Sequence, residues 1–412
     1  MIGRLRRLLG DPLLAALVVG LSLFGVAMVY SAGQLDVPDP TVAGAWRLQL
    51  LWLGVSIVAF LVVLGIQTRW LEWAAIPAYV VGIVLLAATL VIGTGLGTAR
   101  GTKSWIDLGP VMIQPAQFAN LATILMLARV LGRWREPPRS IWGLWQPVGI
   151  VALPMALVML QPDLGTAMVF GAMLIATLYW AGTPVGLIAM LLSPIVGLFL
   201  SFHSVLFSIY VVALIVFLRL YRAYLWEGVG VVVANLAAGA VALPLWNSLE
   251  PYQQARLMVF LNPGMDPRGA GWHLIQSRVA IGSGGLFGKG FTLGTQKRLA
   301  FLPEQHTDFI FSVIGEEFGF VGTVGVLLVF GLILWRLTRI AERLADPFAG
   351  IVVFGIFGVW FAHVIVNIGM TIGLMPITGI PLPFLSYGGS FLLASFLALG
   401  MVQRIAAEQG RI

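Results

Sequence analysis

The chain contains no cysteine and few charged residues, and each shortage excludes a class of protein. Without cysteine among its 412 residues, the chain has no disulfide and no thiolate nucleophile or metal ligand. Only 10% of the residues are charged, against about a quarter in a typical soluble domain. The chain therefore lacks the composition of a water-soluble globular protein.

Hydrophobic residues make up 59% of the chain, and they gather in runs long enough to cross a bilayer, which takes about twenty apolar residues. Twelve such runs predict an all-α, polytopic transmembrane helical bundle of about 12 spans, forming one integral membrane domain over residues 1–412. The predicted spans are residues 13–31, 47–66, 72–93, 114–132, 147–161, 164–181, 185–201, 204–220, 228–246, 310–335, 349–370 and 388–405. The basic residues before the first run resemble those of a signal peptide, but the run is long enough to span, so we expect an uncleaved first helix.

Lysine and arginine together number 24, against 17 acidic residues, and their distribution over the loops predicts the orientation. With both termini in the cytoplasm, fifteen of the 24 lie in inside segments, and all fifteen are arginines. Because the excess of positive charge follows the membrane topology, we expect membrane lipids as partners and no nucleic acid.

The cations on the outer side are concentrated in two segments. Eight of the remaining nine lie in residues 94–113 and 247–308, where the topology rule disfavours them, which predicts an anion-binding site at the outer face. The candidate anion ligands are Arg100, Lys103, Arg256, Arg268 and Lys289. The alternatives are ordinary loop solubility or pairing with Asp107, Glu250 and Glu304.

Residues 247–308 form the one long polar interval of the chain, and we expect a large extracytoplasmic loop that carries the active site. Residues 282–285 (GSGG) with Lys289 and Gly290 offer backbone donors and a cation to an anionic leaving group. The alternative is that these glycines allow helices to pack closely.

The end of this loop carries Glu304, His306 and Asp308, which match no standard metal-ligand spacing. A divalent cation there stays an open alternative, and we expect Thr307 to cap the following helix instead. Glu316 and Glu317, further into that helix, are expected at the membrane interface or facing a cavity.

Two turns carry further candidates. Asp163, between two predicted spans, either caps the second span through Thr166 or belongs to the site. Residues 375–390 contain three prolines yet remain apolar, which predicts a packed re-entrant turn with hydroxyls from Ser386, Tyr387 and Ser390. A purely structural kink is the alternative.

Five motifs closely resemble those of the SEDS family (shape, elongation, division and sporulation), to which RodA, FtsW and SpoVE belong. They are residues 161–166 (QPDLGT), 269–276 (GAGWHLIQ), 280–286 (AIGSGGL), 301–310 (FLPEQHTDFI) and 381–390 (PLPFLSYGGS), and the resemblance covers nearly the whole chain. The residues around the last two motifs look more like the RodA branch.

The resemblance implies a peptidoglycan glycosyltransferase that polymerises lipid II at the outer face of the bacterial cytoplasmic membrane during wall elongation. It implies a class B penicillin-binding protein as partner, no certain cofactor, and Asp266 as the catalytic carboxylate. The shared motifs add Asp163, Gln276, Glu304, His306 and Ser386 to the substrate-binding candidates.

Glycan extension of this kind converts an α-linked pyrophosphate into a β-linked polymer, so it inverts the anomeric centre. One general base and a stabilised leaving group then suffice. Asp266 fits this role because prolines and glycines on both sides place it in an exposed turn, although an Asp-Pro turn without chemistry is the alternative.

The chain departs from the family pattern in two places. The family usually has ten helices, so we expect residues 185–246 to contain an inserted two-helix pair. After Gln114, positions that are charged in the family are Gln117 and Asn120, which we interpret as a neutral amide pair in place of an ion pair.

Two other functions compete with the enzyme. A flippase for the lipid-linked precursor needs ionisable residues spread through the spans, and a non-catalytic scaffold for the penicillin-binding protein is consistent with the changed Gln117 and Asn120 positions. Polymerisation of lipid II by the purified protein distinguishes the three.

Overall fold

The fold is almost entirely helical. The computed structural model describes residues 9–37, 40–95, 103–109, 111–249, 251–261, 270–302 and 304–409. The helices are α2 (Pro12–Ala32), α3 (Pro40–Ala43), α4 (Ala45–Leu64), α5 (Thr68–Ile92), α6 (Pro115–Leu131), the short 3₁₀ helix η1 (Ile141–Leu144), α7 (Trp145–Leu160), α8 (Leu164–Trp180), α9 (Val185–Leu200), α10 (Ser204–Tyr221), α11 (Leu225–Ser248), α12 (Pro251–Leu261), α13 (Ala270–Ser283), α14 (Thr295–Arg298), α15 (Ile310–Glu342), α16 (Pro347–Ile372) and α17 (Gly389–Gln409). Two short antiparallel strands, β1 (Ile106–Asp107) and β2 (Met112–Ile113), pair Ile106 with Ile113.

Each of the twelve predicted spans is a helix in the structure. Nine helices among the described residues are long and apolar enough to cross a membrane, and α6, α8 and α9 are shorter apolar helices. The all-α membrane fold is therefore confirmed, while the total of twelve spans stays a prediction.

The helix ends follow local sequence signals. Asp11, Asp163 and Asp346 each occupy the N-cap position of a long helix and accept a hydrogen bond from a backbone N–H of its first turn. A side-chain oxygen at this position satisfies one of the N–H groups that a helix start leaves without a partner. Glycines follow the ends of α2, α4, α5, α6 and α16.

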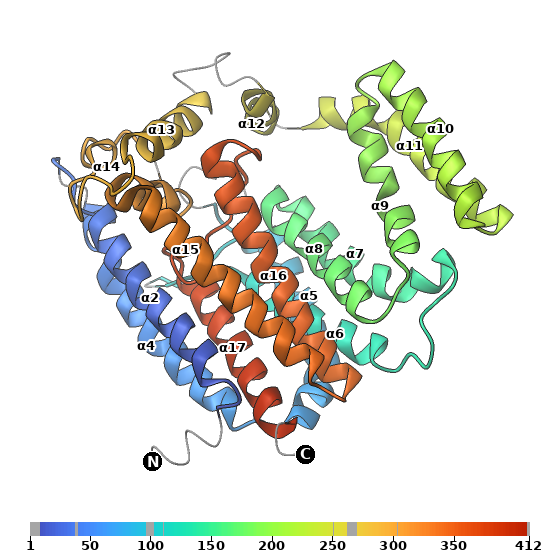
Figure 1. Cartoon of the computed structure of the whole chain (residues 1–412), viewed down its shortest axis with the longest axis horizontal. Coiled ribbons are helices and arrows are strands. Elements are labelled where there is room, and N and C mark those ends of the chain that lie inside the picture. The colour runs from blue at the N-terminus through green and yellow to red at the C-terminus, as the bar shows by residue number, and fades with distance from the viewer. Residues whose placement is uncertain are drawn as a thin grey trace.

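Helices α16 and α17 form the centre of the bundle. The apolar windows of α16 and α17 are 83% and 72% buried inside the protein, against 11–39% for the other candidate spans. Helix α16 packs against α6, α8 and α15, while α17 packs against α4 (Figure 1). The outer helices expose apolar side chains instead, as expected of surfaces that contact lipid.

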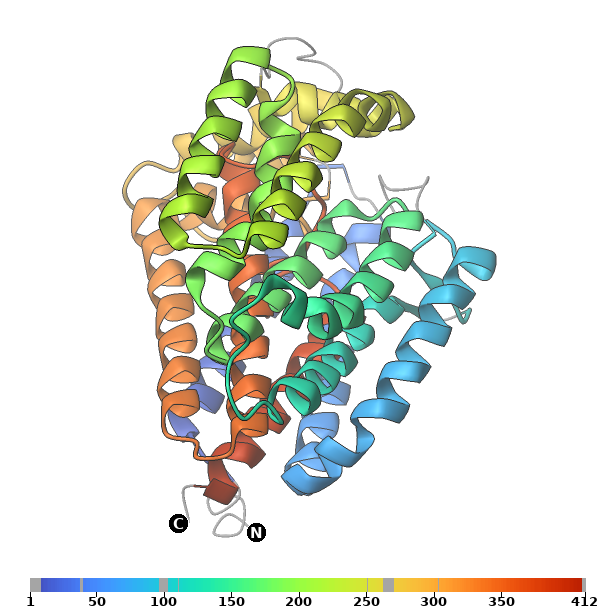
Figure 2. The same ribbon diagram turned by 90° about the vertical axis from the view of Figure 1, so that its right-hand side faces the viewer.

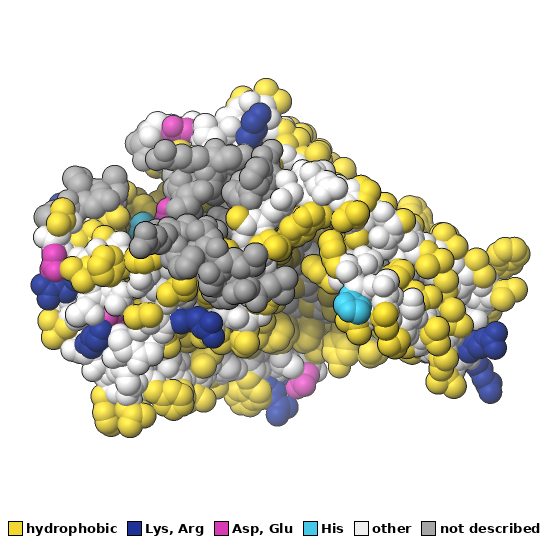
Figure 3. All heavy atoms as spheres, turned by 90° about the horizontal axis from the view of Figure 1, so that it is seen from above, with side chains coloured by type: hydrophobic (Ala, Val, Ile, Leu, Met, Phe, Trp, Pro, Cys, Tyr) yellow, Lys and Arg dark blue, Asp and Glu magenta, His cyan; other side chains and the backbone are white. Residues whose placement is uncertain are grey.

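Helices α9, α10 and α11 form a separate group at the side of the bundle (Figures 1 and 2). Within the group, Asn235 of α11 donates to Ser193 Oγ of α9 at 2.8 Å, and Tyr210 of α10 donates to the Ser193 carbonyl at 2.7 Å. Its outer surface is largely apolar (Figure 3). This placement agrees with a peripheral position for the segment, and the two-helix insertion within it stays a prediction.

The start of α2 and the end of α17 lie at one end of the bundle, and α12, α13 and α14 lie at the other end (Figure 1). Figure 3 views the α12–α14 end, where Lys and Arg side chains lie at several points around the undescribed residues. This is the end to which the sequence assigns the active site.

Candidate active site

The expected large loop, residues 247–308, contains α13, which follows residue 269 directly in the chain. Ser277 Oγ lies 2.7 Å from Ser312 Oγ of α15 and donates to the Thr371 carbonyl of α16 at 2.7 Å. Near the start of α13, Trp272 Nε1 donates to the Phe301 carbonyl at 2.7 Å. Helix α13 is thus fixed against two long helices of the bundle.

Three of the predicted site residues, Asp266, Arg268 and Arg100, lie outside the described residues. Arg256 belongs to α12, but its side chain is also outside the description. Gln276 lies half-buried on α13.

Lys103 precedes the two-stranded ribbon that leads into α6. Its ammonium group is exposed and donates to the Leu90 carbonyl at 3.4 Å. At the far side of the ribbon, Ser390 Oγ accepts from Gln114 N at 3.1 Å, which places the ribbon over the start of α17.

Asp163 caps α8, as one of its two interpretations expected. Its carboxylate accepts from Thr166 N at 3.0 Å, from Thr166 Oγ1 at 2.9 Å and from Gln114 Nε2 at 3.2 Å. Burial raises the pKa of the Asp163 carboxyl, and hydrogen bonds from Thr166, Gln114 and Ser104 act against that rise. The Asp163 carboxylate therefore binds both the start of α8 and Gln114, the residue that follows β2. Its role in substrate binding stays a prediction.

The turn before α15 contains Glu304 and His306. Glu304 has a positive φ of 51°, and its carbonyl accepts from the N–H of Thr307 at 3.2 Å and of Asp308 at 3.0 Å. The expected capping of α15 by Thr307 is wrong: α15 begins at Ile310 without a side-chain cap, because the Thr307 hydroxyl donates back to Glu304.

No three His, Asp or Glu side chains form a metal-sized cluster within the described ranges. The turn contacts the buried loop after α16 instead, since the His306 carbonyl accepts from Tyr387 N at 2.9 Å. The rings of His306 and Tyr387 are also 5.4 Å apart between centroids.

Residues 374–388 form the packed non-helical turn that the sequence predicts. Leu382 and Leu385 are fully buried. Ser386 Oγ accepts from Leu382 N at 2.8 Å, so this candidate hydroxyl closes the loop on itself. The Ser386 carbonyl accepts from Gln49 Nε2 of α4 at 3.2 Å.

Two side chains of α16 hold this loop, and the sequence interpretation missed both. Asn367 Nδ2 donates to the Ile380 carbonyl at 2.8 Å, and His363 Nδ1 lies 2.9 Å from the Pro381 carbonyl. The signal was present, because polar side chains inside an otherwise apolar span usually face the protein interior and serve a purpose there.

Lys289 and Lys297 are bound to carboxylates. Lys289 Nζ lies 2.7 Å from Glu316 Oε1, and the fully buried Lys297 pairs with the equally buried Glu317. These two lysines pair with Glu316 and Glu317 rather than with the expected partners Asp107, Glu250 and Glu304. Both glutamates thus contact the loop, while their expected place at the membrane interface or beside a cavity stays a prediction.

The glycine-rich centre packs tightly against α15. A Cβ on Gly284 would lie 2.0 Å from the Gly315 carbonyl oxygen, and one on Gly288 would lie 2.1 Å from the Glu317 carbonyl oxygen. The N–H groups of Lys289 and Gly290 donate to backbone carbonyls of α15 at 3.0 Å each. Close packing thus accounts for Gly284 and Gly288, while a Cβ on Gly282 or Gly285 would meet open space. The N–H groups of Lys289 and Gly290 are not available to a leaving group.

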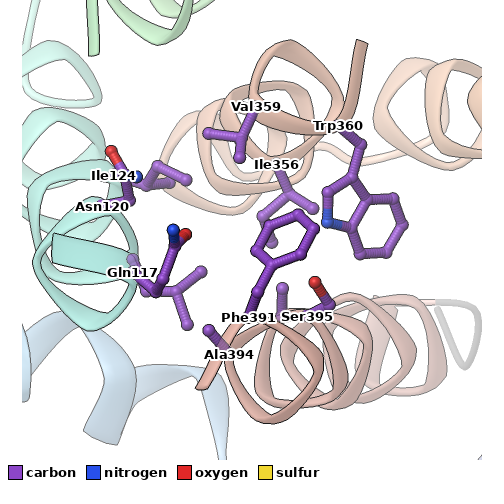
Figure 4. Close-up of a pocket in the computed structure, with 11 residues that line it drawn as sticks. Gln117, Asn120, Ile124, Ile356, Val359, Trp360, Phe391, Ala394 and Ser395 are labelled. Atoms are coloured by element: carbon purple, nitrogen blue, oxygen red, sulfur yellow. The ribbon is translucent and has the colours of Figure 1, made fainter. Parts of the chain in front are cut away.

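Gln117 and Asn120 do not form the amide pair expected of them. Gln117 Nε2 donates to Gln114 Oε1 at 2.9 Å, and neither amide atom of the buried Asn120 has a partner among the described residues. Both side chains line a cavity of about 10 Å³ with Trp360 and Ser395 (Figure 4), a volume that accommodates about one water molecule.

Several candidate residues thus converge at one end of the bundle. Asp163 contacts Gln114, Gln114 contacts Ser390, and the loop before Ser390 contacts His306. Burial raises the pKa of the Tyr387 phenol in the same loop, so this group stays a neutral donor. The arrangement gathers polar groups from α8, α6, the turn before α15 and the loop before α17.

Known proteins resemble nearly the whole chain. A family model described as cell cycle protein FtsW/RodA/SpoVE matches residues 12–224 and 203–411. The chain is 35% identical to the peptidoglycan glycosyltransferase RodA of Treponema pallidum, over 97% of this chain and 98% of that protein. It is 34% identical to the peptidoglycan glycosyltransferase MrdB of Escherichia coli, over 96% of this chain and 93% of that protein.

Solved structures give the same result. One chain, from work on the structural coordination of polymerization and crosslinking by a peptidoglycan synthase complex, has a TM-score of 0.70 and 28% identity, covering 98% of this chain and 99% of that one. The crystal structure of the rod shape determining protein RodA of Thermus thermophilus has a TM-score of 0.63 and 27% identity, covering 97% of each chain. The protein is a multi-pass membrane protein, and it belongs to the FtsW/RodA/SpoVE family.

Proposed function

We propose that the protein is a peptidoglycan glycosyltransferase that polymerises lipid II at the outer face of the bacterial cytoplasmic membrane during cell-wall elongation. The observation that carries the proposal is similarity along nearly the full length to relatives named for this activity, two of which are at least 34% identical. The contacts that join Asp163, Gln114 and Ser390, and the contact of His306 with the loop before α17, support the proposal.

In this proposal Asp266 is the general base. It accepts the proton of the attacking sugar hydroxyl while the lipid pyrophosphate leaves from the opposite face of the anomeric carbon, so the configuration inverts. No covalent intermediate forms, and one carboxylate is enough for the acid–base chemistry.

The leaving pyrophosphate needs cations. Because Lys289 is held by Glu316 at 2.7 Å, we assign the phosphate contacts first to Arg100, Lys103, Arg256 and Arg268. Lys103 supports this assignment, since among the described residues its exposed ammonium group has a long carbonyl contact at 3.4 Å and no carboxylate partner, and a compact charge suits phosphate.

The proposed partner is a class B penicillin-binding protein that cross-links the new glycan. The similarity to a chain from a complex that coordinates polymerization and crosslinking supports it. The proposed orientation has both termini in the cytoplasm, which puts the α12–α14 end outside the cell.

The experiment is a polymerisation assay with purified protein in liposomes and labelled lipid II. Moenomycin is included to exclude contaminating classical glycosyltransferases. Glycan polymer supports the proposal. Translocation of lipid II without polymer would instead identify a flippase, and neither product would identify a non-catalytic scaffold.

A further inference from the structure

Helix α15 is interrupted at Gly319, and the loop after α13 repairs the interruption. Gly319 has φ 65° and ψ −158°, outside the helical region. In a regular helix the carbonyls of Glu316 and Glu317 accept from the N–H groups four residues later. Here they accept from Lys289 N and Gly290 N, at 3.0 Å each.

The exchange of hydrogen bonds is reciprocal. Phe320 N donates to the Gly285 carbonyl at 2.8 Å, and Val321 N donates to the Leu286 carbonyl at 3.1 Å. Every backbone group that the break in α15 would otherwise leave unpaired at these positions is thus satisfied by residues 285–290, as a buried backbone requires.

The side chains of the two residues before the break hold the same loop. Glu316, which is fully buried, accepts at Oε1 from Lys289 Nζ at 2.7 Å, from Thr295 N at 2.8 Å and from Gln296 N at 3.0 Å. Thr295 Oγ1 also donates to this oxygen, at 3.0 Å, so four donors converge on it. Glu316 therefore joins two parts of the loop, near residue 289 and at the start of α14.

Glu317 extends the connection to the first helix. It pairs with Lys297 and accepts from Ser31 Oγ at 2.6 Å, while Lys297 Nζ donates to the Ser31 carbonyl at 2.7 Å. Side-chain exposure is 0% for both members of this pair. Separating such a buried pair leaves an uncompensated charge, so Lys297 stays bound to Glu317. Together with the Glu316 contacts, this holds residues 284–298 against α15.

These residues follow α13 without interruption, and the Phe301 carbonyl just beyond them accepts from Trp272 at the other end of α13. We propose that Glu316 and Glu317 are positioning residues: by holding residues 284–298, they fix α13 and with it the point where the chain arrives from Asp266. The inference rests on the proposed function in one respect, the role of Asp266.

A direct role of Lys289 on the substrate phosphate makes a different prediction, and a double-mutant cycle separates the two. The variants are Lys289→Met, Glu316→Gln and the double variant, with Lys289→Arg as the conservative replacement. The matched control is Arg298→Met in the same segment, whose partner Asp36 is 2.7 Å away in an exposed pair.

If Lys289 and Glu316 act together to position α13, both single variants lower kcat with little change in KM. The loss reaches up to about 10²-fold, the cost of a small misplacement of a catalytic group. The double variant is no worse than the worse single variant, Lys289→Arg recovers most of the rate, and Arg298→Met behaves as wild type. A raised KM in Lys289→Met beside a normal Glu316→Gln overturns the proposal in favour of a phosphate contact.

Hydrogen exchange provides a readout that is independent of activity. Peptides over residues 270–298 should exchange faster in Lys289→Met and Glu316→Gln than in wild type, while peptides within α16 stay unchanged. Lys289, with 28% of its side chain exposed, carries the test if Glu316→Gln does not fold. Faster exchange with an unchanged polymerisation rate overturns the positioning role.

The same measurement separates this proposal from the proposed function. Asp266→Asn should lower the polymerisation rate by about 10²–10⁴-fold and leave the exchange of residues 270–298 as in wild type. If no variant or wild-type protein polymerises lipid II but the exchange pattern is as described, the proposed function fails while the connection between α15 and the loop stands.

Discussion

The side-chain amide of Asn367 donates to the backbone carbonyl of Asp308 at 2.9 Å. The same nitrogen donates to the Ile380 carbonyl at 2.8 Å, so one side chain of the most buried helix joins the turn before α15 to the loop before α17. Two segments far apart in sequence are therefore fixed relative to each other through α16.

Replacing Asn367 should lower stability and activity together. Asn367→Leu leaves the buried Ile380 carbonyl and the half-buried Asp308 carbonyl without this donor, and a buried group that loses its partner costs about 1–3 kcal/mol. Thermal unfolding of the purified protein in detergent measures the change. Ser208→Ala, which removes an exposed hydrogen bond within α10, is the control and should unfold close to wild type; equal effects of the two substitutions would contradict the account.

Replacing Asn120 should instead raise the stability of the protein. Its amide is buried without a partner among the described residues, and Asn120→Leu replaces that amide by an apolar group of similar size in a cavity lined mostly by apolar side chains, with Gln117 and Ser395 as polar exceptions. We expect the protein to become more stable by about 1–3 kcal/mol, measured by the same unfolding assay. A loss of stability would mean that a bound water satisfies Asn120 in solution.

The buried pair of Lys297 and Glu317 should show strong coupling in stability. Lys297→Met leaves the Glu317 carboxylate buried without its cation, at a cost of about 3–5 kcal/mol. The double variant Lys297→Met with Glu317→Gln should recover part of that loss. Arg339→Met, which breaks an exposed pair with Glu342, should cost no more than about 1 kcal/mol, and additive effects of the two buried substitutions would argue against the pair.

Asp163 predicts a specific pH dependence of stability. Burial raises its pKa in the folded protein, so above the unfolded value of about 3.9 the folded state binds more protons than the unfolded state. Stability then falls as pH rises from that value through the folded pKa. The unfolding temperature of wild type should fall relative to Asp163→Asn over this range, and parallel curves for the two proteins would exclude the shift.

The helices were predictable from the sequence because each of the twelve apolar runs is set by local composition. The packed turn at 374–388 was predictable for the same reason, since three prolines in an apolar segment allow few other structures. These features depend on residues close to each other along the chain.

The pairing of the lysines was not predictable in this way. Lys297 meets Glu317 and Ser31 only because α2, α14 and α15 come together in the fold, and Ser31 is 266 residues away in sequence from Lys297. The break at Gly319 was not predictable either. A single glycine inside an apolar span does not indicate that a loop outside the helix replaces its hydrogen bonds.

The most direct test of the central claim is the rate of lipid II polymerisation by Asp266→Asn. The substitution keeps the shape of the side chain and removes its ability to accept a proton. The account predicts a fall in rate of about 10²–10⁴-fold, with lipid II binding much less affected. Near wild-type polymerisation by Asp266→Asn, together with loss of activity in folded Asp163→Asn or Glu304→Gln, would contradict the account and move the base to one of those carboxylates.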